Sequence, residues 1–352
     1  MCGKQETGDS HSGHRRLDAR IVFATYFRIV KQDHIVGVDL GGTKILAAVF
    51  DSKHRLLARE KRGTKPELGA PGVIERVAGC VNEALAVAAI PHAAVAAVGI
   101  GVPGQIDPKG QIVRGAPNLH WHDVPVAKLL SKRIHIPVVV VNDVQAGTLA
   151  VKEIGAGKKL TDFVCMFIGT GIGGGLVIGG ELYRGAQGIA GEIGHMVVVA
   201  HDGPRCGCGN RGCLEAVASR SAIVRQVVAA MEKGRKSVVR DLCDGDMSRI
   251  RSRILTEAYR EGDKVVTEII HDACEYIGIG AANLINILNP QAVILGGGLI
   301  EALGDRMLPR IAKAAMAHTI AASPERVRIK DSGLGDDAGI LGAALAARAL
   351  VK

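Results

Sequence analysis

The sequence predicts an α/β protein built from two similar units that face each other across a cleft. Short apolar segments with strand character alternate with longer segments whose apolar residues recur at helical spacing. A strand, a glycine-rich turn and a second strand follow one another twice, over residues 34–51 and again from residue 162. Alternating strands and helices are typical of α/β architecture. The repeated pattern predicts two copies of one unit.

The first unit is expected to begin at residue 35. Residues 1–34 show no clear periodicity, and we predict that they form a disordered extension. Pro71 suits the first turn of the first helix. After the initial strand–turn–strand, the expected elements are a strand at 55–60, a helix at 70–89, a strand at 94–104, a helix at 125–134, a strand at 137–143 and a helix at 144–154.

The second unit repeats this order with longer helices. After its own strand–turn–strand, the expected elements are helices at about 215–233, 248–260 and 263–288, a strand at 291–299, a helix at 308–320, a strand at 326–330 and a helix at 336–350. We therefore expect a small N-terminal domain, formed by residues 35–140 plus 338–352, and a large domain over residues 141–337.

The composition favours a globular enzyme over a nucleic-acid-binding or membrane protein. The net charge is +9, but Lys and Arg are scattered, and the densest runs, HRRLDAR (14–20) and RIRSR (249–253), are short. Nucleic-acid binders usually carry a basic stripe with aromatic residues nearby, and aromatic residues make up only 3% of this chain. No apolar run reaches the roughly 18 to 20 residues that span a bilayer. We therefore expect no nucleic-acid partner, no membrane partner and a cytoplasmic location.

Glycine is enriched in short loops, which suggests backbone packed closely against a ligand such as phosphate. GTGIGG (169–174) matches a dinucleotide-binding pattern, but an apolar strand follows it where that motif requires a helix. A glycine-rich turn between strands can still bind an anion through its backbone N–H groups. DLGGTK (39–44) offers a second such turn, with a carboxylate at Asp39 and a hydroxyl at Thr43. A tight hairpin remains the alternative for either turn taken alone.

Three of the eight cysteines lie close together in the sequence CGCGNRGC (206–213). They could form disulfides, act as redox thiols or bind a metal. The glycines between them let the backbone bend, and three thiolates with a fourth ligand are typical of a tetrahedral structural zinc site. His195 is the candidate for the fourth ligand, and we interpret the nearby His201 as a loop residue. The isolated cysteines are interpreted as buried free thiols.

Several motifs together resemble a known family. DLGGT (39–43) and GTGIGGG (169–175) are similar to the two phosphate loops of the actin-like sugar kinase superfamily. GEIGHM (191–196) and CGCGNRGCLEAVAS (206–219) resemble the signature of the ROK family (repressors, ORFs, kinases), and the likeness covers about 35–350. The resemblance implies the actin-like ATPase (ribonuclease H-like) fold. It also implies a function like that of bacterial zinc-containing, ATP-dependent glucokinases.

The resemblance assigns roles around the cysteines. It implies that His195, Cys206, Cys208 and Cys213 bind a structural Zn²⁺. It also implies that Glu192, His195 and Glu215 contact sugar hydroxyls, so that the metal would fix the sugar-binding residues on both sides of it. A glutamate such as Glu215 on a helix is usually solvated, and only its place in GCLEA supports this role.

A catalytic base is expected where the strand PVVVVND (137–143) ends. Active groups in α/β folds often lie at the carboxyl ends of strands, although an Asp at that position could simply cap the next helix. By resemblance, Asp143 is the base that accepts the proton of the sugar hydroxyl, and Asn142 and Asn118 bind the sugar. The sole tryptophan, Trp121, is interpreted as a packing residue.

The expected second substrate is ATP with Mg²⁺, and Asp39 is expected to act on Mg²⁺ through water. The residues assigned to ATP and Mg²⁺ are Asp39, Gly41, Gly42, Thr43, Lys44, Gly169, Thr170, Gly171, Gly173, Gly296, Gly297 and Gly298. The predicted reaction is phosphorylation of the 6-hydroxyl of glucose by ATP, and the expected assembly, by resemblance only, is a homodimer or homotetramer.

Four alternatives stay open at this stage. The main one is a ROK kinase for another sugar, such as N-acetylmannosamine, N-acetylglucosamine, fructose or allose. A ROK transcriptional regulator would carry an N-terminal winged helix-turn-helix, and residues 1–34 lack two periodic helices. A polyphosphate-dependent glucokinase would generally lack the zinc signature. An NAD-dependent oxidoreductase would need a helix after GTGIGG.

Overall fold

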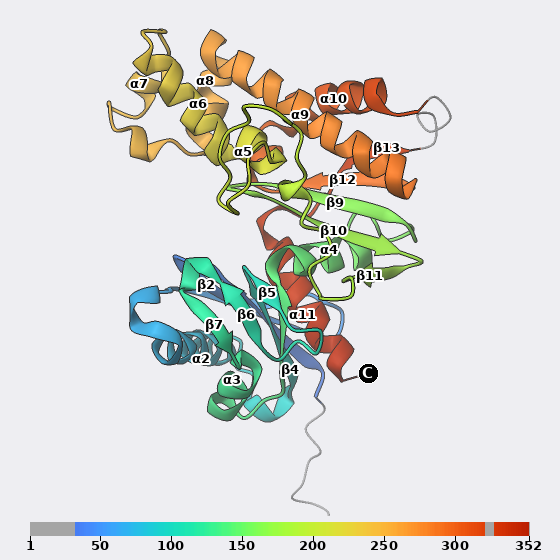
Figure 1. Cartoon of the computed structure of the whole chain (residues 1–352). Helices are drawn as coiled ribbons and strands as arrows, with labels where there is room; N and C mark the ends of the chain where they lie inside the picture. The colour runs from blue at the N-terminus through green and yellow to red at the C-terminus, as the bar shows by residue number, and fades with distance from the viewer. Residues whose placement is uncertain (1–31, 321–326, 352) are drawn as a thin grey trace, which may run out of the picture.

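The computed structural model describes residues 32–320 and 327–351, which form two lobes with a five-stranded sheet in each (Figure 1). The expected extension falls mostly on residues 1–31, which lie outside the described residues, and residue 34 already begins the first strand. No helix of the described residues is long and apolar enough to cross a membrane.

The two sheets have the same construction. In each, three strands form an antiparallel meander, a fourth strand pairs in parallel with the first strand of the meander, and a fifth pairs in parallel with the fourth, in the orders β3-β2-β1-β4-β8 and β11-β10-β9-β12-β13. The first sheet comprises β1 (His34–Leu40), β2 (Lys44–Phe50), β3 (Leu56–Gly63), β4 (Val95–Val102) and β8 (Val138–Asn142). The second comprises β9 (Phe163–Ile168), β10 (Ile172–Ile178), β11 (Glu181–Tyr183), β12 (Ala292–Gly296) and β13 (Arg328–Asp331). The predicted duplication of an α/β unit is confirmed.

Helices cover each sheet with an apolar core between them. The buried faces of α2 (Gly69–Val87) and α3 (Val126–Ile134) form one core with β1, β2 and β4. Above the second sheet, α9 (Lys264–Leu288) and α10 (Gly298–His318) pack against each other. Shorter helices complete that lobe: α5 (Leu214–Ala218), α6 (Arg220–Glu232), α7 (Val239–Leu242) and α8 (Ser252–Arg260).

Several expected elements differ from the structure. The helix expected at 215–233 is broken at Ser219, whose hydroxyl accepts the Ala222 N–H at 3.1 Å and so starts α6 afresh. The helix expected from residue 308 begins at Gly298 and contains Pro309 in its interior. The expected helix at 248–260 begins at Ser252. A third sheet, absent from the expectations, consists of β5 (Gln105–Ile106), β6 (Val113–Ala116) and β7 (Trp121–Val124).

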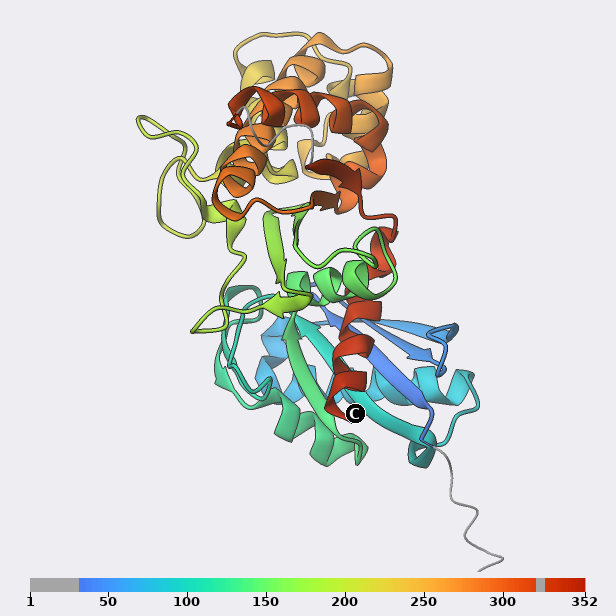
Figure 2. The same cartoon turned by 90° about the vertical axis from the view of Figure 1, so that its right-hand side faces the viewer.

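Two helices join the lobes. The helix α4 (Asp143–Glu153) follows the last strand of the first sheet but packs on β10 of the second. Conversely, α11 (Ala338–Leu350) follows the second sheet but packs on β1 and β4 of the first, and the two helices pack against each other (Figures 1 and 2). The expected domain boundaries, 35–140 plus 338–352 and 141–337, stay a prediction.

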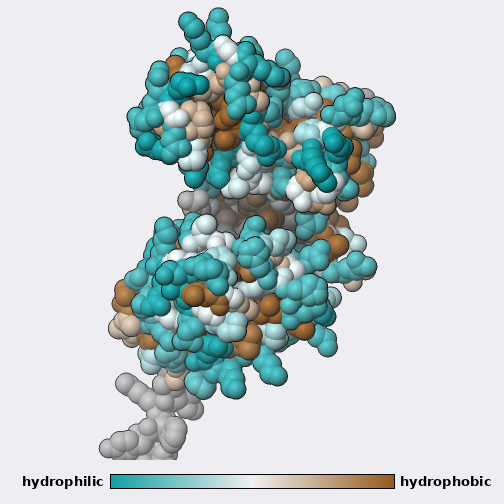
Figure 3. Space-filling view, turned by 60° about the vertical axis from the view of Figure 1, so that its left-hand side comes forward, coloured by the Kyte–Doolittle hydropathy of each residue, from teal (hydrophilic) through white to brown (hydrophobic). Residues whose placement is uncertain are grey.

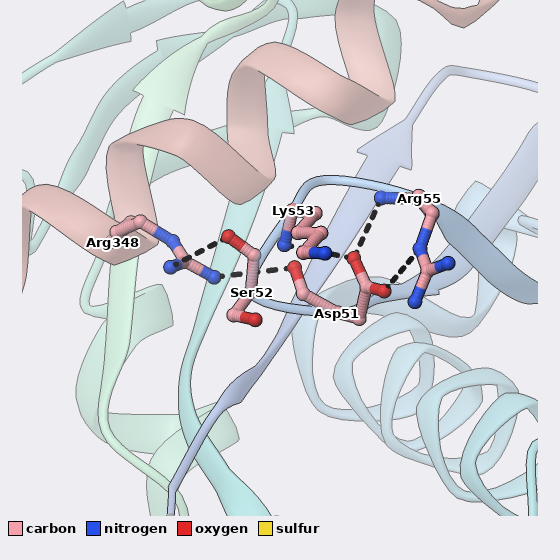
Figure 4. A network of polar contacts seen from close by, with 5 residues as sticks. All are labelled: Asp51, Ser52, Lys53, Arg55 and Arg348. Atoms are coloured by element: carbon pink, nitrogen blue, oxygen red, sulfur yellow. Dashed lines mark hydrogen bonds and ion pairs between the residues drawn. The ribbon is translucent and has the colours of Figure 1, made fainter.

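The end of α11 is tied to the turn between β2 and β3 (Figure 4). The Arg348 guanidinium donates to the backbone carbonyl oxygens of Asp51 at 3.3 Å and Ser52 at 3.4 Å. The Asp51 carboxylate holds the turn by accepting the backbone N–H groups of Lys53 and Arg55, each at 2.9 Å. These contacts connect residues almost 300 positions apart.

Glycines allow the joining helices to approach closely. A Cβ at Gly342 of α11 would lie 1.6 Å from the backbone oxygen of Ala146 in α4, and a Cβ at Gly99 of β4 would lie 1.7 Å from that of Ala343. The sequence suggested that glycine is enriched for contact with phosphate. Part of this enrichment instead serves close packing between backbones.

We expect Gly342→Ala to destabilise the protein by about 1–3 kcal/mol, because the new methyl group overlaps the Ala146 carbonyl and the two helices must separate. Chemical denaturation would measure the free energy of unfolding. The matched control is Gly339→Ala on the same helix, where a Cβ meets nothing within 4 Å. This control should keep or raise the stability, since alanine favours helix. Equal stabilities for the two variants would contradict the expectation.

Candidate active site

A cleft of about 700 Å³ lies between the lobes, and the space-filling view shows the molecule hollowed there (Figure 3). Its walls come from the β8–α4 junction, the segment after β6, the β9–β10 turn and the segment over 188–195. Because the joining helix α4 begins in this cleft, the first residues of α4 face both lobes.

Asn142 and Asp143 lie where β8 passes into α4. The Asn142 side-chain oxygen accepts the backbone N–H groups of Val144 and Gln145, each at 3.0 Å, and its amide nitrogen donates to the Gly104 oxygen at 3.0 Å. Asn142 is therefore the N-cap of α4, and one amide N–H is left for a ligand. The sequence left capping of the helix as the alternative role for Asp143. In the structure, its neighbour Asn142 supplies that cap.

The pKa of Asp143 is raised to about 6, mainly by burial and in smaller part by the negative charges of Asp39 and Glu192. The Val144 N–H, 2.9 Å from the Asp143 carboxylate, acts in the opposite direction and only partly offsets the effect of burial. A carboxylate with a pKa near 6 is mostly ionised at neutral pH and accepts a proton readily. Asp143 therefore has the environment of a general base.

The four predicted metal ligands converge. The side-chain donor atoms of His195, Cys206, Cys208 and Cys213 all lie within 4.8 Å of one another. The Cys208 and Cys213 sulfurs are 3.7 Å apart, and His195 Nδ1 is 3.6 Å from the Cys206 sulfur. Tetrahedral zinc with Zn–S bonds of about 2.3 Å separates its sulfur ligands by about 3.8 Å. The residues present therefore fit a tetrahedral metal ion.

Two side chains connect this cluster to the cleft. While His195 Nδ1 faces Cys206, its Nε2 lies 3.8 Å from the Glu192 carboxylate, which lines the cleft. Glu215 accepts the Ile172 N–H at 2.9 Å with one oxygen and has the other 3.9 Å from the Cys206 sulfur. The cluster thus holds three cleft residues, and Glu215 also fixes the start of β10.

The glycines of the predicted phosphate-binding segments are required for different structural reasons. A Cβ at Gly171, in the β9–β10 turn, would lie 2.3 Å from a Glu215 oxygen. Gly173 belongs to β10, and its missing side chain makes room for Val144 of α4. Gly297 has φ of 89°, and a Cβ there would lie 2.8 Å from the Ile168 oxygen. The segment at 296–298 therefore packs against the end of β9, directly before the second turn.

Most predicted site residues line the cleft: Asn118, Asn142, Asp143, Gly169, Thr170, Gly171, Gly173, Glu192, His195, Glu215 and Gly297. The others lie outside its lining: Asp39, Gly41, Gly42, Thr43, Lys44, Cys206, Cys208, Cys213, Gly296 and Gly298. The first turn is nevertheless close, since a Cβ at Gly42 would lie 3.3 Å from the Asn118 Cβ. His201 is not part of the ligand group formed by the described residues. Trp121 is 5% exposed and belongs to the core.

The sequence did not single out Gln145, which lines the cleft, or Arg220, which lies outside the lining but contacts one of its residues. Gln145 is buried and donates to the Gly188 oxygen at 3.1 Å, which fastens the 188–191 segment to α4. Arg220, at the start of α6, donates a hydrogen bond to the Thr170 hydroxyl in the second turn. A glutamine or arginine alone on a helix carries no pattern that identifies it, although Gln145 follows the ND pair closely.

Two duplicated lobes, exchanged helices and glycine turns at the cleft define a protein of the kinase class that has the actin-like ATPase fold. Within this class the chain belongs to the ROK family, whose profile matches residues 35–349. The expected fold and the family resemblance are both confirmed.

The relatives include kinases and repressors. The chain is 38% identical over 311 residues to a glucokinase of Thermotoga maritima, covering 88% of this chain and 96% of the relative. It is 31% identical to a putative xylose repressor of a Caldicellulosiruptor species, covering 88% of this chain and 76% of the relative. The crystal structure of a ROK family glucokinase from Streptomyces griseus with glucose and AMPPNP has a TM-score of 0.78 and 36% identity, over 90% of this chain and 99% of that one.

Proposed function

We propose that this protein is an ATP-dependent glucokinase that phosphorylates the 6-hydroxyl of glucose and releases glucose 6-phosphate and ADP. The observation that carries this proposal is the environment of Asp143: a half-buried carboxylate with a pKa near 6, in the cleft, opposite a glycine turn. Similar glucokinases, and a solved one bound to glucose and AMPPNP, support the choice of substrates.

The hexose would bind in the cleft through Asn118, Asn142, Asp143, Glu192, His195 and Glu215, all of which line it. Carboxylates accept hydrogen bonds from sugar hydroxyls, and amides both donate and accept. The metal, when bound, would lock the positions of His195 and of the segment before Glu215. Structural zinc is the ion we propose, because three thiolates and one imidazole are its preferred set.

MgATP would bind along the glycine turns, which offer backbone N–H groups to its phosphates. Asp39 would act on Mg²⁺ through water, since Mg²⁺ keeps much of its hydration shell. Closure of the lobes about α4 and α11 would exclude water that could otherwise accept the phosphoryl group.

In the chemical step, the Asp143 carboxylate accepts the proton of the sugar 6-hydroxyl as that oxygen bonds to the γ-phosphorus. The bond between the γ-phosphorus and the bridging β–γ oxygen breaks, and its electron pair leaves with ADP. The proton remains on Asp143 until solvent removes it after the lobes open.

The first test is ADP release, coupled to a second enzyme, over a panel of sugars with and without a metal chelator. Glucose should give the highest kcat/KM. Preferred turnover of N-acetylmannosamine, N-acetylglucosamine, fructose or allose would keep the kinase and replace its substrate. Absence of nucleotide consumption with every sugar, together with specific DNA binding in a gel shift, would favour the regulator, which the similarity to repressors keeps as a second candidate.

The pH dependence gives a further prediction. Only ionised Asp143 accepts a proton, so kcat/KM for glucose should be constant above about pH 7 and fall about tenfold per unit below pH 6. Asp39 and Glu192 face Asp143 and set this midpoint together with burial. Initial rates from pH 4.5 to 8.5 would measure it, with return to pH 7.5 as a control for unfolding. A midpoint near 4 would contradict the assignment.

We place this activity in the cytoplasm, where thiols stay reduced, because the seven cysteines of the described residues are all free. The homodimer or homotetramer stays a prediction that rests on the resemblance alone.

A further inference from the structure

Arg220 stands at the junction of the second glycine turn and α6. Its backbone N–H donates to the Gly169 oxygen at 3.0 Å, and its guanidinium donates to the Thr170 hydroxyl oxygen. The next residue, Ser221, donates its N–H to the Thr170 oxygen at 3.4 Å. The turn and the start of α6 are therefore one connected unit.

The chemistry of the Arg220–Thr170 contact determines which of the two groups donates the hydrogen bond. A guanidinium has donors only, so the Thr170 oxygen is the acceptor and keeps its own proton to donate elsewhere. Thr170 is exposed and lines the cleft. Arg220 thereby presents the Thr170 O–H as a donor toward a ligand in the cleft.

The positive charge of Arg220, next to this donor, is not neutralised by a carboxylate in the described part of the chain. Arg220 is half-buried, and among the described residues it takes part in no ion pair. Burial and the positive charge of Arg251 lower the pKa of Arg220 from its ordinary value. Arg251 comes from the basic run at 249–253 and is fixed by the carbonyl oxygens of Ser248 at 2.6 Å and Ile250 at 2.9 Å.

A guanidinium without a carboxylate partner beside a glycine turn favours the binding of a polyanion there. We propose that Arg220 is a positioning residue for the phosphate chain of the donor nucleotide: it orients the Thr170 hydroxyl toward the phosphates and supplies positive charge to that subsite. The identity of the donor as ATP rests on the proposed function; the anion subsite itself rests on the contacts of Arg220.

Calorimetric titration of the full chain with adenosine, MgADP and MgATP, without sugar, tests the proposal. Arg220→Ala should weaken MgADP and MgATP about tenfold and leave adenosine unchanged, because only the phosphates meet Arg220. Arg220→Lys, which keeps the charge but not the planar fork, should recover about half of this loss on a logarithmic scale. Thr170→Val should weaken MgADP, and the double variant should be no weaker than the poorer single one, since Arg220 acts through Thr170.

Arg235→Gln is the matched control. Arg235 follows the far end of α6, about 20 Å along the helix axis, and pairs with Glu268 at 2.6 Å. The same loss of charge there should leave all three dissociation constants unchanged. Equal weakening of adenosine and MgADP by Arg220→Ala, or an equal effect of Arg235→Gln, would overturn the proposal, because a general loss of structure or of net charge would then explain the result.

Steady-state kinetics separates this inference from the proposed function. Arg220→Ala should raise KM for ATP about tenfold and leave KM for glucose unchanged. If the wild type binds MgADP in the predicted manner but phosphorylates no hexose, the proposed function fails and the phosphate subsite stands. If the wild type binds no adenine nucleotide, the subsite fails as well.

Discussion

Asp143→Asn is expected to lower kcat by about 10²- to 10⁴-fold while glucose still binds. The amide keeps an oxygen where the carboxylate accepts the Val144 N–H at 2.9 Å, so the start of α4 should be preserved. The amide cannot take up the proton of the sugar hydroxyl, and the reaction loses its base. The defect should therefore lie in kcat and not in KM for glucose.

Two measurements decide this prediction. The first is kcat at saturating ATP and glucose, with Asp305→Asn as the control, since Asp305 lies exposed on α10 and pairs with its neighbour Arg306. The second is glucose binding, followed by the fluorescence of Trp121, which is the only tryptophan and lies two residues beyond the short helix that carries Asn118. Wild-type kcat in Asp143→Asn would exclude Asp143 as the base.

Cys208→Ser is expected to remove the metal and to raise KM for glucose about 10- to 100-fold. Cys208 is the exposed member of the four-ligand cluster, so the substitution takes away a ligand with little effect on the core. Without the metal, the segments that hold Glu192, His195 and Glu215 lose the link that joins them. The melting temperature should fall too, because metal binding contributes to folding.

Elemental analysis, thermal melting and sugar titration would measure these effects. Cys80→Ser is the control: Cys80 is buried in the first lobe, far from the cluster in sequence, and its thiol donates to the Glu60 oxygen at 3.4 Å, a bond that serine can keep. One zinc per chain in the wild type and none in Cys208→Ser is the expected pattern. Full metal content or unchanged KM in Cys208→Ser would contradict the role given to the cluster.

The main elements of the fold could be predicted because they depend on local pattern. The buried strands are apolar over their whole length, as in β4, and the glycine turns between them are unmistakable in DLGGTK and GTGIGG. The small sheet of β5 to β7 could not be predicted, because strands of two to four residues are too short to show alternation. The break at Ser219 depends on one hydroxyl that caps α6.

The site could be predicted only where a motif spans it. The cysteine spacing pointed to a metal, and the structure brings the same four side chains together. Gly173 shows the limit of such patterns, since its place in GTGIGG suggests phosphate while its neighbour is Val144 of α4. Arg220 and Thr170 are 50 positions apart, so their contact arises only when the start of α6 and the second turn come together in the fold.

The exchange of α4 and α11 has a consequence for how the chain reaches its native state during synthesis. The first sheet is complete once residue 142 has emerged from the ribosome, yet one of its faces is covered by a helix made of residues 338–350. That apolar face must therefore wait, unshielded, until residues 338–350 have been made. A helix from the far end of the described chain thus completes the lobe that is made first.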